Sequence, residues 1–148
     1  MFVRTLVDRD FTLFYFDRHG SLADLVEAVR IYLDRGPTLK ELFYFDTDAQ
    51  FITPVQMRQI IPFASRAVAL RGQGARTALL YGRDSLYGLG RIYKVLETRI
   101  ARRPWTTEVF KDLGKANAWL DIPPPLVPDL IAAHNVPAGW TAFPFGRD

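Results

Sequence analysis

The sequence predicts a single α/β domain built on a mixed, mostly parallel sheet. Strand-like segments alternate with amphipathic helical segments from residue 21 onward, and this alternation is typical of right-handed crossovers between parallel strands. Only three residues separate the first two strand segments, which indicates a hairpin. A chain of 148 residues is long enough to bury one sizeable core. The expected order is β-β-α-β-α-β-α-β-α.

Five strands are expected, because five runs are rich in β-branched and aromatic residues. They cover residues 2–7, 11–17, 41–46, 76–82 and 105–110. The third run is apolar on both faces, as in a strand at the centre of a sheet. The first run should pair antiparallel with the second, which makes the sheet mixed.

Four helices are expected between and after these strands. The first begins after Ser21, which can form a capping box, and ends at Gly36. The second has Thr53 as its cap, and Pro62 should kink or divide it because proline removes a backbone hydrogen bond. The third runs to about residue 100, and Asp112 can cap the fourth.

The C-terminal segment, residues 122–148, has a different composition. It holds six of the ten prolines, together with Trp140, Phe143 and Phe145, and is too apolar for a simple disordered tail. A short helix is expected over residues 128–134. The tail should pack on its own domain, and packing on another chain, as in a homodimer, is the alternative.

Composition excludes several classes of site. The chain has no cysteine, which rules out disulfides, thiolate metal sites and cysteine nucleophiles. Its two histidines, His19 and His134, are far apart, and we expect neither a metal nor another cofactor. The first residues lack the pattern of a signal peptide, and no apolar run reaches the ~20 residues that span a bilayer. A cytoplasmic protein without membrane insertion is therefore expected.

Residues 58–103 form a basic block with ten basic and two acidic side chains. Such a block could attract an anionic partner, but a solvated surface balanced by acidic residues elsewhere is the favoured interpretation. Nucleic-acid binding would require exposed aromatics beside the arginines, whereas the aromatics here fall on strands and core stripes. A nucleic-acid partner is not expected. The block comprises Arg58, Arg66, Arg71, Arg76, Arg83, Arg91, Lys94, Arg99, Arg102 and Arg103.

Gly82, Gly88 and Gly90 lie where the fourth strand leads into the third helix, a position that often binds phosphate. Neither the P-loop spacing nor the dinucleotide-binding spacing is present. Glycine inside a helix costs ~1 kcal/mol relative to alanine, so close approach to the sheet or to another helix is the expected reason for it. Arg91 and the free N–H groups near Asp84 could still hold a small anion.

Asp46 and Asp48 follow the central strand, where α/β proteins often place functional groups. Two carboxylates there could bind a hard cation or act as acid and base. Neither a histidine nor a third acid is near in sequence, and an acidic loop is a common solubilising feature. We therefore expect no catalytic residue.

Two stretches of the chain resemble the SpoIIAA-like family of small bacterial proteins. That family has the STAS fold of anti-anti-sigma factors and is also compared with the lipid-binding Sec14 (CRAL-TRIO) fold. The likeness covers residues 1–121 and leaves the tail outside. It is carried by Leu79-Leu80-Tyr81-Gly82 with Gly88, Arg91 and Tyr93, and by Val109-Phe110-Lys111-Asp112 with Ala116 and Ala118-Trp119-Leu120.

The resemblance implies a layered βα structure and a non-enzymatic binding or regulatory role. STAS domains of the anti-anti-sigma type carry a phosphorylatable serine in an Asp-Ser-Ser-Gly motif at a helix start after a central strand. The corresponding place is Ile52-Thr53-Pro54-Val55, where the motif is absent and Thr53 is the only hydroxyl. This departure argues against a kinase-controlled switch.

Three functional hypotheses follow. The leading one is a cytoplasmic regulatory domain that binds a protein partner where the third and fourth strands lead into their helices. Its rival is a carrier or sensor of a small apolar or amphipathic ligand, in a pocket between helices and sheet lined by Tyr81, Tyr87 and Tyr93. The third is an enzyme using Asp46 and Asp48. The candidate binding surface comprises Asp46, Asp48, Thr53, Arg83, Asp84 and Arg91.

Overall fold

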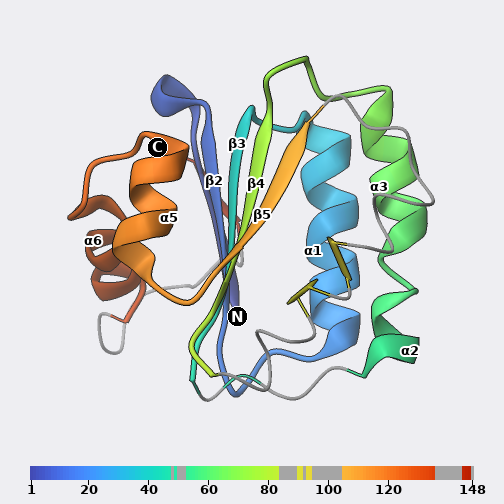
Figure 1. Cartoon of the computed structure of the whole chain (residues 1–148), viewed down its shortest axis with the longest axis horizontal. Helices are drawn as coiled ribbons and strands as arrows, with labels where there is room; N and C mark the ends of the chain where they lie inside the picture. The colour runs from blue at the N-terminus through green and yellow to red at the C-terminus, as the bar shows by residue number, and fades with distance from the viewer. Residues whose placement is uncertain are drawn as a thin grey trace.

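A mixed sheet lies at the centre of the molecule, with helices on both of its faces (Figure 1). The computed structural model describes residues 1–47, 49, 53–83, 90–91, 93–94, 105–135 and 145–147. The strands are β1 (Phe2–Leu6), β2 (Phe11–Phe16), β3 (Lys40–Phe45), β4 (Arg76–Tyr81), β5 (Thr106–Phe110) and β6 (Phe145–Arg147). The helices are η1 (Val7–Arg9, a 3-10 turn), α1 (Leu22–Arg35), α2 (Pro54–Met57), α3 (Ile61–Val68), α5 (Leu113–Leu120) and α6 (Leu126–His134).

The first five strands begin and end within one residue of the runs that predict them. The predicted α/β fold class and mixed sheet are therefore confirmed. Gly90, Arg91, Tyr93 and Lys94 are helical, and the remainder of the expected third helix lies outside the described residues.

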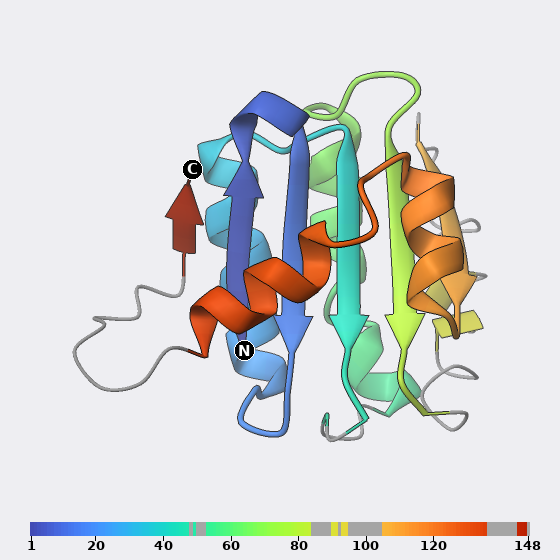
Figure 2. The ribbon, with the colours of Figure 1, turned by 90° about the vertical axis from the view of Figure 1, so that its left-hand side faces the viewer.

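The order of strands in the sheet is β5-β4-β3-β2-β1-β6. The β1–β2 hairpin is antiparallel, as expected, and the other neighbouring strands pair in parallel. Strands β2 to β5 lie side by side in chain order, so right-handed crossovers place the connecting helices on one face. Helices α1, α2 and α3 do lie together on that face, whereas α5 and α6 cover the opposite one (Figures 1 and 2).

The predicted helix signals are present at the N-termini of α1 and α2. Ser21 Oγ accepts a hydrogen bond from the backbone N–H of Asp24 at 3.1 Å, and the Asp24 carboxylate accepts one from Ser21 N at 2.8 Å. The predicted division at Pro62 is also confirmed. Helix α2 ends at Met57, and α3 begins at Ile61 with Pro62 in its first turn, where a missing N–H is tolerated.

The sheet buries a separate hydrophobic core on each face. Side chains alternate along a strand, so Phe14 joins the core beneath α1 and α3, while Leu13 joins the core beneath α5 and α6. Both side chains are fully buried. Strand β3 contributes to both cores through Phe45 and Leu42, as expected of a central strand.

The described part of the tail packs on its own chain. Val127 and Leu130 of α6 are buried in the core beneath α5 and α6, and α6 begins at Leu126, slightly earlier than expected. Strand β6 was not expected from the sequence. It extends the sheet by pairing in parallel with β1, with Phe145 opposite Val3.

None of the helices in the described ranges combines the length and apolar character that crossing a bilayer requires.

Candidate functional site

The loops after β3 and β4 approach each other closely at the carboxyl end of the parallel strands. The backbone N–H of Gly82 donates to the carbonyl of Phe45 at 2.9 Å, and the Arg83 guanidinium donates to the carbonyl of Ala49 at 2.7 Å. A Cβ on Gly82 would lie 2.7 Å from the backbone N of Thr47, closer than real Cβ contacts. Glycine at this position therefore serves packing between two loops.

Asp46 is held by both of its carboxylate oxygens. The Tyr15 hydroxyl donates to Oδ2, and the backbone N–H of Thr47 donates to Oδ1 at 2.7 Å. Burial, together with the hydrogen bond to Asp46, raises the pKa of Tyr15, which keeps this hydroxyl a donor. Asp46 thus fixes the end of β3. Asp48 lies outside the described residues. Among the described residues, no group of three or more His, Cys, Asp or Glu side chains could hold a metal ion.

The remaining residues of the candidate binding surface are separate features. Thr53 is exposed and caps α2: its Oγ1 accepts from the backbone N–H of Gln56 at 3.2 Å, and Gln56 Oε1 accepts from Thr53 N at 2.9 Å. Beside it, Val55 is 70% exposed. Arg91 is exposed on the helical residues after β4, and Asp84 lies outside the described residues.

A network of buried polar side chains, here called the polar row, lies at the opposite, amino end of the parallel strands. At its centre Glu41 and Arg71 form a salt bridge of 3.1 Å, with side chains 7% and 1% exposed. Tyr32 donates to Glu41 Oε1 at 2.6 Å. Burial raises the pKa of Tyr32, and the charge of Glu41 raises it further. The polar row comprises Thr12, Tyr32, Thr38, Glu41, Arg71 and Thr77.

Every arm of the Arg71 guanidinium is engaged. Its Nη1 donates to Thr77 Oγ1 at 2.7 Å, its Nη2 to the carbonyl of Leu39 at 3.0 Å, and its Nε to the carbonyl of Thr38 at 3.3 Å. The guanidinium also lies over the ring of Trp105, 5.0 Å from its centroid. Because the donors and the charge are satisfied, the polar row is a structural element.

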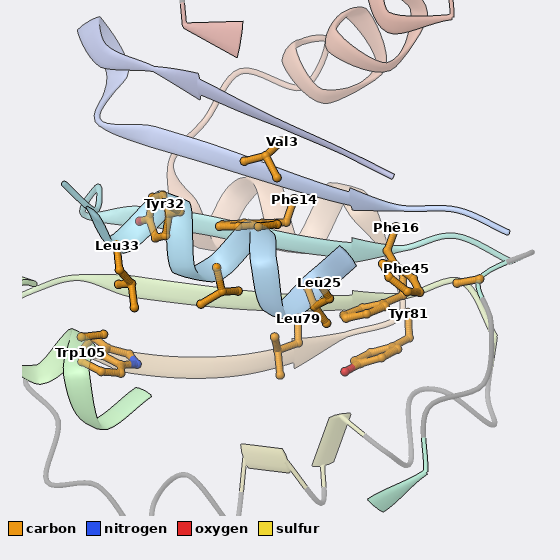
Figure 3. Close-up of a cluster of buried hydrophobic side chains, with 14 of the residues drawn as sticks. Val3, Phe14, Phe16, Leu25, Tyr32, Leu33, Phe45, Leu79, Tyr81 and Trp105 are labelled. Carbon is orange, nitrogen blue, oxygen red and sulfur yellow. The ribbon is translucent and has the colours of Figure 1, made fainter. Parts of the chain in front are cut away.

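An apolar cavity of about 60 Å³ lies between this face of the sheet and helices α1 and α3. Figure 3 shows Trp105 at the amino end of the strands and Phe45 and Tyr81 toward the carboxyl end, and all three line the cavity. Glu41 and Arg71 of the polar row line it as well. The other lining side chains are Leu25, Val29, Tyr32, Leu33, Phe43, Ile60, Phe63, Ala67, Thr77, Leu79 and Tyr93. Of the three tyrosines expected to line a ligand pocket, Tyr81 and Tyr93 lie in the wall of this cavity. Tyr87 lies outside the described residues.

The ring of Tyr81 is closely packed on two sides at this cavity. Its ring stacks on that of Phe45, with centroids 4.7 Å apart and planes at 3°. On the helix side, a Cβ on Gly90 would lie 2.2 Å from Tyr81 Cε2, so only glycine allows this approach. The Tyr81 hydroxyl is buried without a hydrogen-bond partner. Burial raises its pKa, so it stays protonated at neutral pH.

Several side chains of the basic block bind within the chain. Arg66 pairs with Asp34, Arg76 donates to the carbonyl of Trp119 at 2.6 Å, and Lys94 pairs with Glu108 at 2.9 Å. With Arg71 and Arg83, these contacts tie helices and loops to the strands. Five of the seven block residues that the structure describes thus make contacts within the chain, and Arg66, Arg71 and Lys94 pair with acidic residues from elsewhere in the fold. Arg99, Arg102 and Arg103 lie outside the described residues.

Sequence reasoning missed the polar part of the cavity wall. In the sequence, Arg71 is one arginine of the basic block and Glu41 is the first residue of a strand. A signal was available: Glu41 begins a run that is otherwise apolar on both faces, and a charged side chain buried there requires a partner. Glu41 and Thr77 are register partners on adjacent strands.

Comparisons with protein-family models, with curated proteins and with solved structures found no match to this chain.

Proposed function

We propose that this chain is a non-enzymatic binding domain of SpoIIAA-like, STAS-like fold that carries or senses a small apolar ligand. The apolar cavity is the observation that carries this proposal. Its volume of about 60 Å³ is several times what one water needs, roughly 10–15 Å³, and its mostly apolar walls offer water few partners. Drug-sized ligands occupy roughly 300–1,000 Å³, so the ligand is a few heavy atoms, or a single ring where partly buried side chains at the rim move.

The topology supports the STAS-like part of the proposal. The resemblance implies a layered βα structure, and strands β2 to β5 lie in chain order with α1, α2 and α3 on one face. The antiparallel β1–β2 hairpin precedes them. The cavity forms between this helical layer and the sheet, where the ligand hypothesis expects it.

A binding role agrees better than catalysis with the polar groups at the carboxyl end of the strands. General acid–base catalysis needs a side chain that can exchange a proton with a substrate. Asp46 instead accepts hydrogen bonds at both oxygens. Thr53 caps α2, and Arg83 donates to Ala49.

Native mass spectrometry of freshly purified protein tests whether a ligand is carried, and an NMR titration with toluene tests whether the cavity can be filled. We expect toluene to shift resonances of cavity-lining residues. Ala67, on α3 in the cavity wall, offers a matched variant: Ala67→Leu should fill the space and abolish the toluene shifts while circular dichroism stays unchanged. An apo mass together with no toluene shifts in the wild type would overturn the proposal.

A second candidate function, regulation by a cytoplasmic protein partner, is favoured by the exposed Val55 next to the exposed Thr53. An apolar side chain beside a hydroxyl at a helix start could form part of a contact surface. A pull-down with the wild type, Val55→Asp and Thr53→Glu tests it. Loss of the same partner in both variants is expected, and an unchanged partner list would remove this surface. A homodimer through the tail is tested by the molecular mass in solution.

A further inference from the structure

We infer that the hydroxyl of Tyr81 is the recognition group of the cavity. The ligand class that fits is a small neutral molecule, apolar over most of its surface and carrying one hydroxyl or carbonyl oxygen. This inference rests on the proposed function and adds to it the chemical class of ligand.

The first observation is that the Tyr81 hydroxyl is unsatisfied. A buried polar group without a hydrogen bond is costly, and native structures keep few of them. Among the described residues, the other buried side-chain atom in this condition is Oδ1 of Asn117, which lies on α5, on the opposite face of the sheet. Tyr81 is 2% exposed, and in Figure 3 its oxygen points along the face of the sheet toward Leu79, which also lines the cavity.

The second observation is that the hydroxyl is positioned before any ligand arrives. The ring of Tyr81 is held between the ring of Phe45 and the backbone of Gly90. A ligand that bonds to a fixed hydroxyl loses less side-chain entropy than one that must first order it. The phenol O–H can donate to a ligand oxygen or accept from a ligand hydroxyl.

The third observation concerns charge. Glu41 and Arg71 also line the cavity, but they pair with each other and with the hydroxyls of Tyr32 and Thr77. A charged ligand would therefore enter an apolar space without a free counter-charge from these two residues, at a high desolvation cost. A neutral ligand avoids this cost.

The size of the ligand follows from the cavity and its rim. A dry cavity of about 150 Å³ accepts a benzene ring, whereas the cavity measures about 60 Å³. The remaining space must come from side chains that can move. Ile60, Phe63 and Tyr93 line the cavity and are only partly buried, so small rotations of these side chains would admit one ring.

Phenol and toluene form a matched pair of probes, because they differ by a hydroxyl in place of a methyl group. NMR titrations of both probes into the wild type and Tyr81→Phe compare four dissociation constants. We expect Tyr81→Phe to weaken phenol binding about fivefold, the effect of one neutral hydrogen bond, and to leave toluene binding unchanged. Tyr44→Phe is the control, since Tyr44 packs in the opposite core and should leave both constants unchanged.

The possible results separate the inference from the function on which it rests. If Tyr81→Phe weakens phenol binding and Tyr44→Phe does not, the result supports both the inference and the proposed function. If toluene binds and phenol has equal dissociation constants in the wild type and Tyr81→Phe, the recognition role of Tyr81 is overturned. The cavity then remains a ligand site. Failure of both probes to bind the wild type overturns the inference, and together with an apo mass it overturns the proposed function as well. Circular dichroism of each variant verifies that it is folded.

Discussion

Two buried tyrosine hydroxyls, one at each end of the same sheet face, differ in their hydrogen bonding. At the amino end, the Tyr32 hydroxyl donates to Glu41 at 2.6 Å and accepts from the backbone N–H of Thr38 at 2.7 Å. At the carboxyl end, the Tyr81 hydroxyl is buried to a similar degree and has no partner. The same chemical group is therefore part of a closed network at one end and unsatisfied at the other.

This difference distinguishes buried polar groups that stabilise the fold from a buried polar group that is available to a ligand. A satisfied buried network specifies one arrangement of the elements that it joins, and removing any member leaves other members unpaired. An unsatisfied buried hydroxyl contributes nothing to the fold and lowers its stability. It is therefore a better candidate for a recognition group than the more conspicuous charged residues of the polar row.

The largest effect is expected from Arg71→Met. The substitution leaves the carboxylate of Glu41 buried without its cation, which typically costs about 3–5 kcal/mol. The free energy of unfolding, measured by urea denaturation, should fall by this amount. The double variant Glu41→Leu with Arg71→Met should recover part of the loss, because it removes the unpaired charge although the hydroxyls of Tyr32 and Thr77 lose these partners. A single variant as stable as the wild type would contradict the structural role of the polar row.

Gly90→Ala tests the contact that holds Tyr81. Helix propensity alone predicts stabilisation, but the new Cβ would meet Tyr81 Cε2 at 2.2 Å. Overpacking of this kind costs about 1–3 kcal/mol, so the free energy of unfolding should fall. Gly72→Ala is the matched control, since its Cβ would meet only Leu39 Cδ2 at 3.5 Å. Equal effects of the two variants would show that Gly90 does not hold the ring.

The dependence of the free energy of unfolding on alkaline pH should also report on the two buried tyrosines. Burial raises the pKa of Tyr81 and Tyr32 above the ordinary value of about 10. Above pH 10 the unfolded chain loses these protons while the folded protein keeps them, so the free energy of unfolding falls as the pH rises. Each group should contribute a slope of about 1.4 kcal/mol per pH unit above pH 10. Tyr81→Phe removes one group, so its stability should fall less steeply between pH 10 and 11; identical slopes would count against a buried Tyr81 hydroxyl.

Local sequence signals predicted the framework well because their causes are local. Capping residues such as Ser21 and Thr53, the break at Pro62 and the alternation of strand residues act within a few positions along the chain. The alternation of strands and helices then restricts the topology through crossover handedness. The packing role expected of the glycines is also seen at Gly82 and Gly90, where the neighbouring atoms leave no room for a Cβ.

The candidate site was harder to predict because it depends on pairings between distant segments. The sequence predicts Tyr81 as a pocket residue, but the ring that stacks on it is that of Phe45 from another strand. The partner of Glu41 could not be selected from the arginines of the basic block without knowing that Arg71 follows α3. Strand β6 has only three residues, with Gly146 at its centre, and pairs through backbone groups that carry no sequence pattern.

The most direct test compares Tyr81→Phe with Tyr32→Phe in ligand-free protein. Removing an unsatisfied buried hydroxyl should raise the free energy of unfolding by about 1 kcal/mol or more, whereas removing the Tyr32 hydroxyl, which bonds to a carboxylate, should lower it by about 1.5–3 kcal/mol. Urea denaturation of the two variants beside the wild type measures both. Opposite signs are the predicted result. A loss of stability in Tyr81→Phe would show that its hydroxyl is already satisfied and would contradict the account.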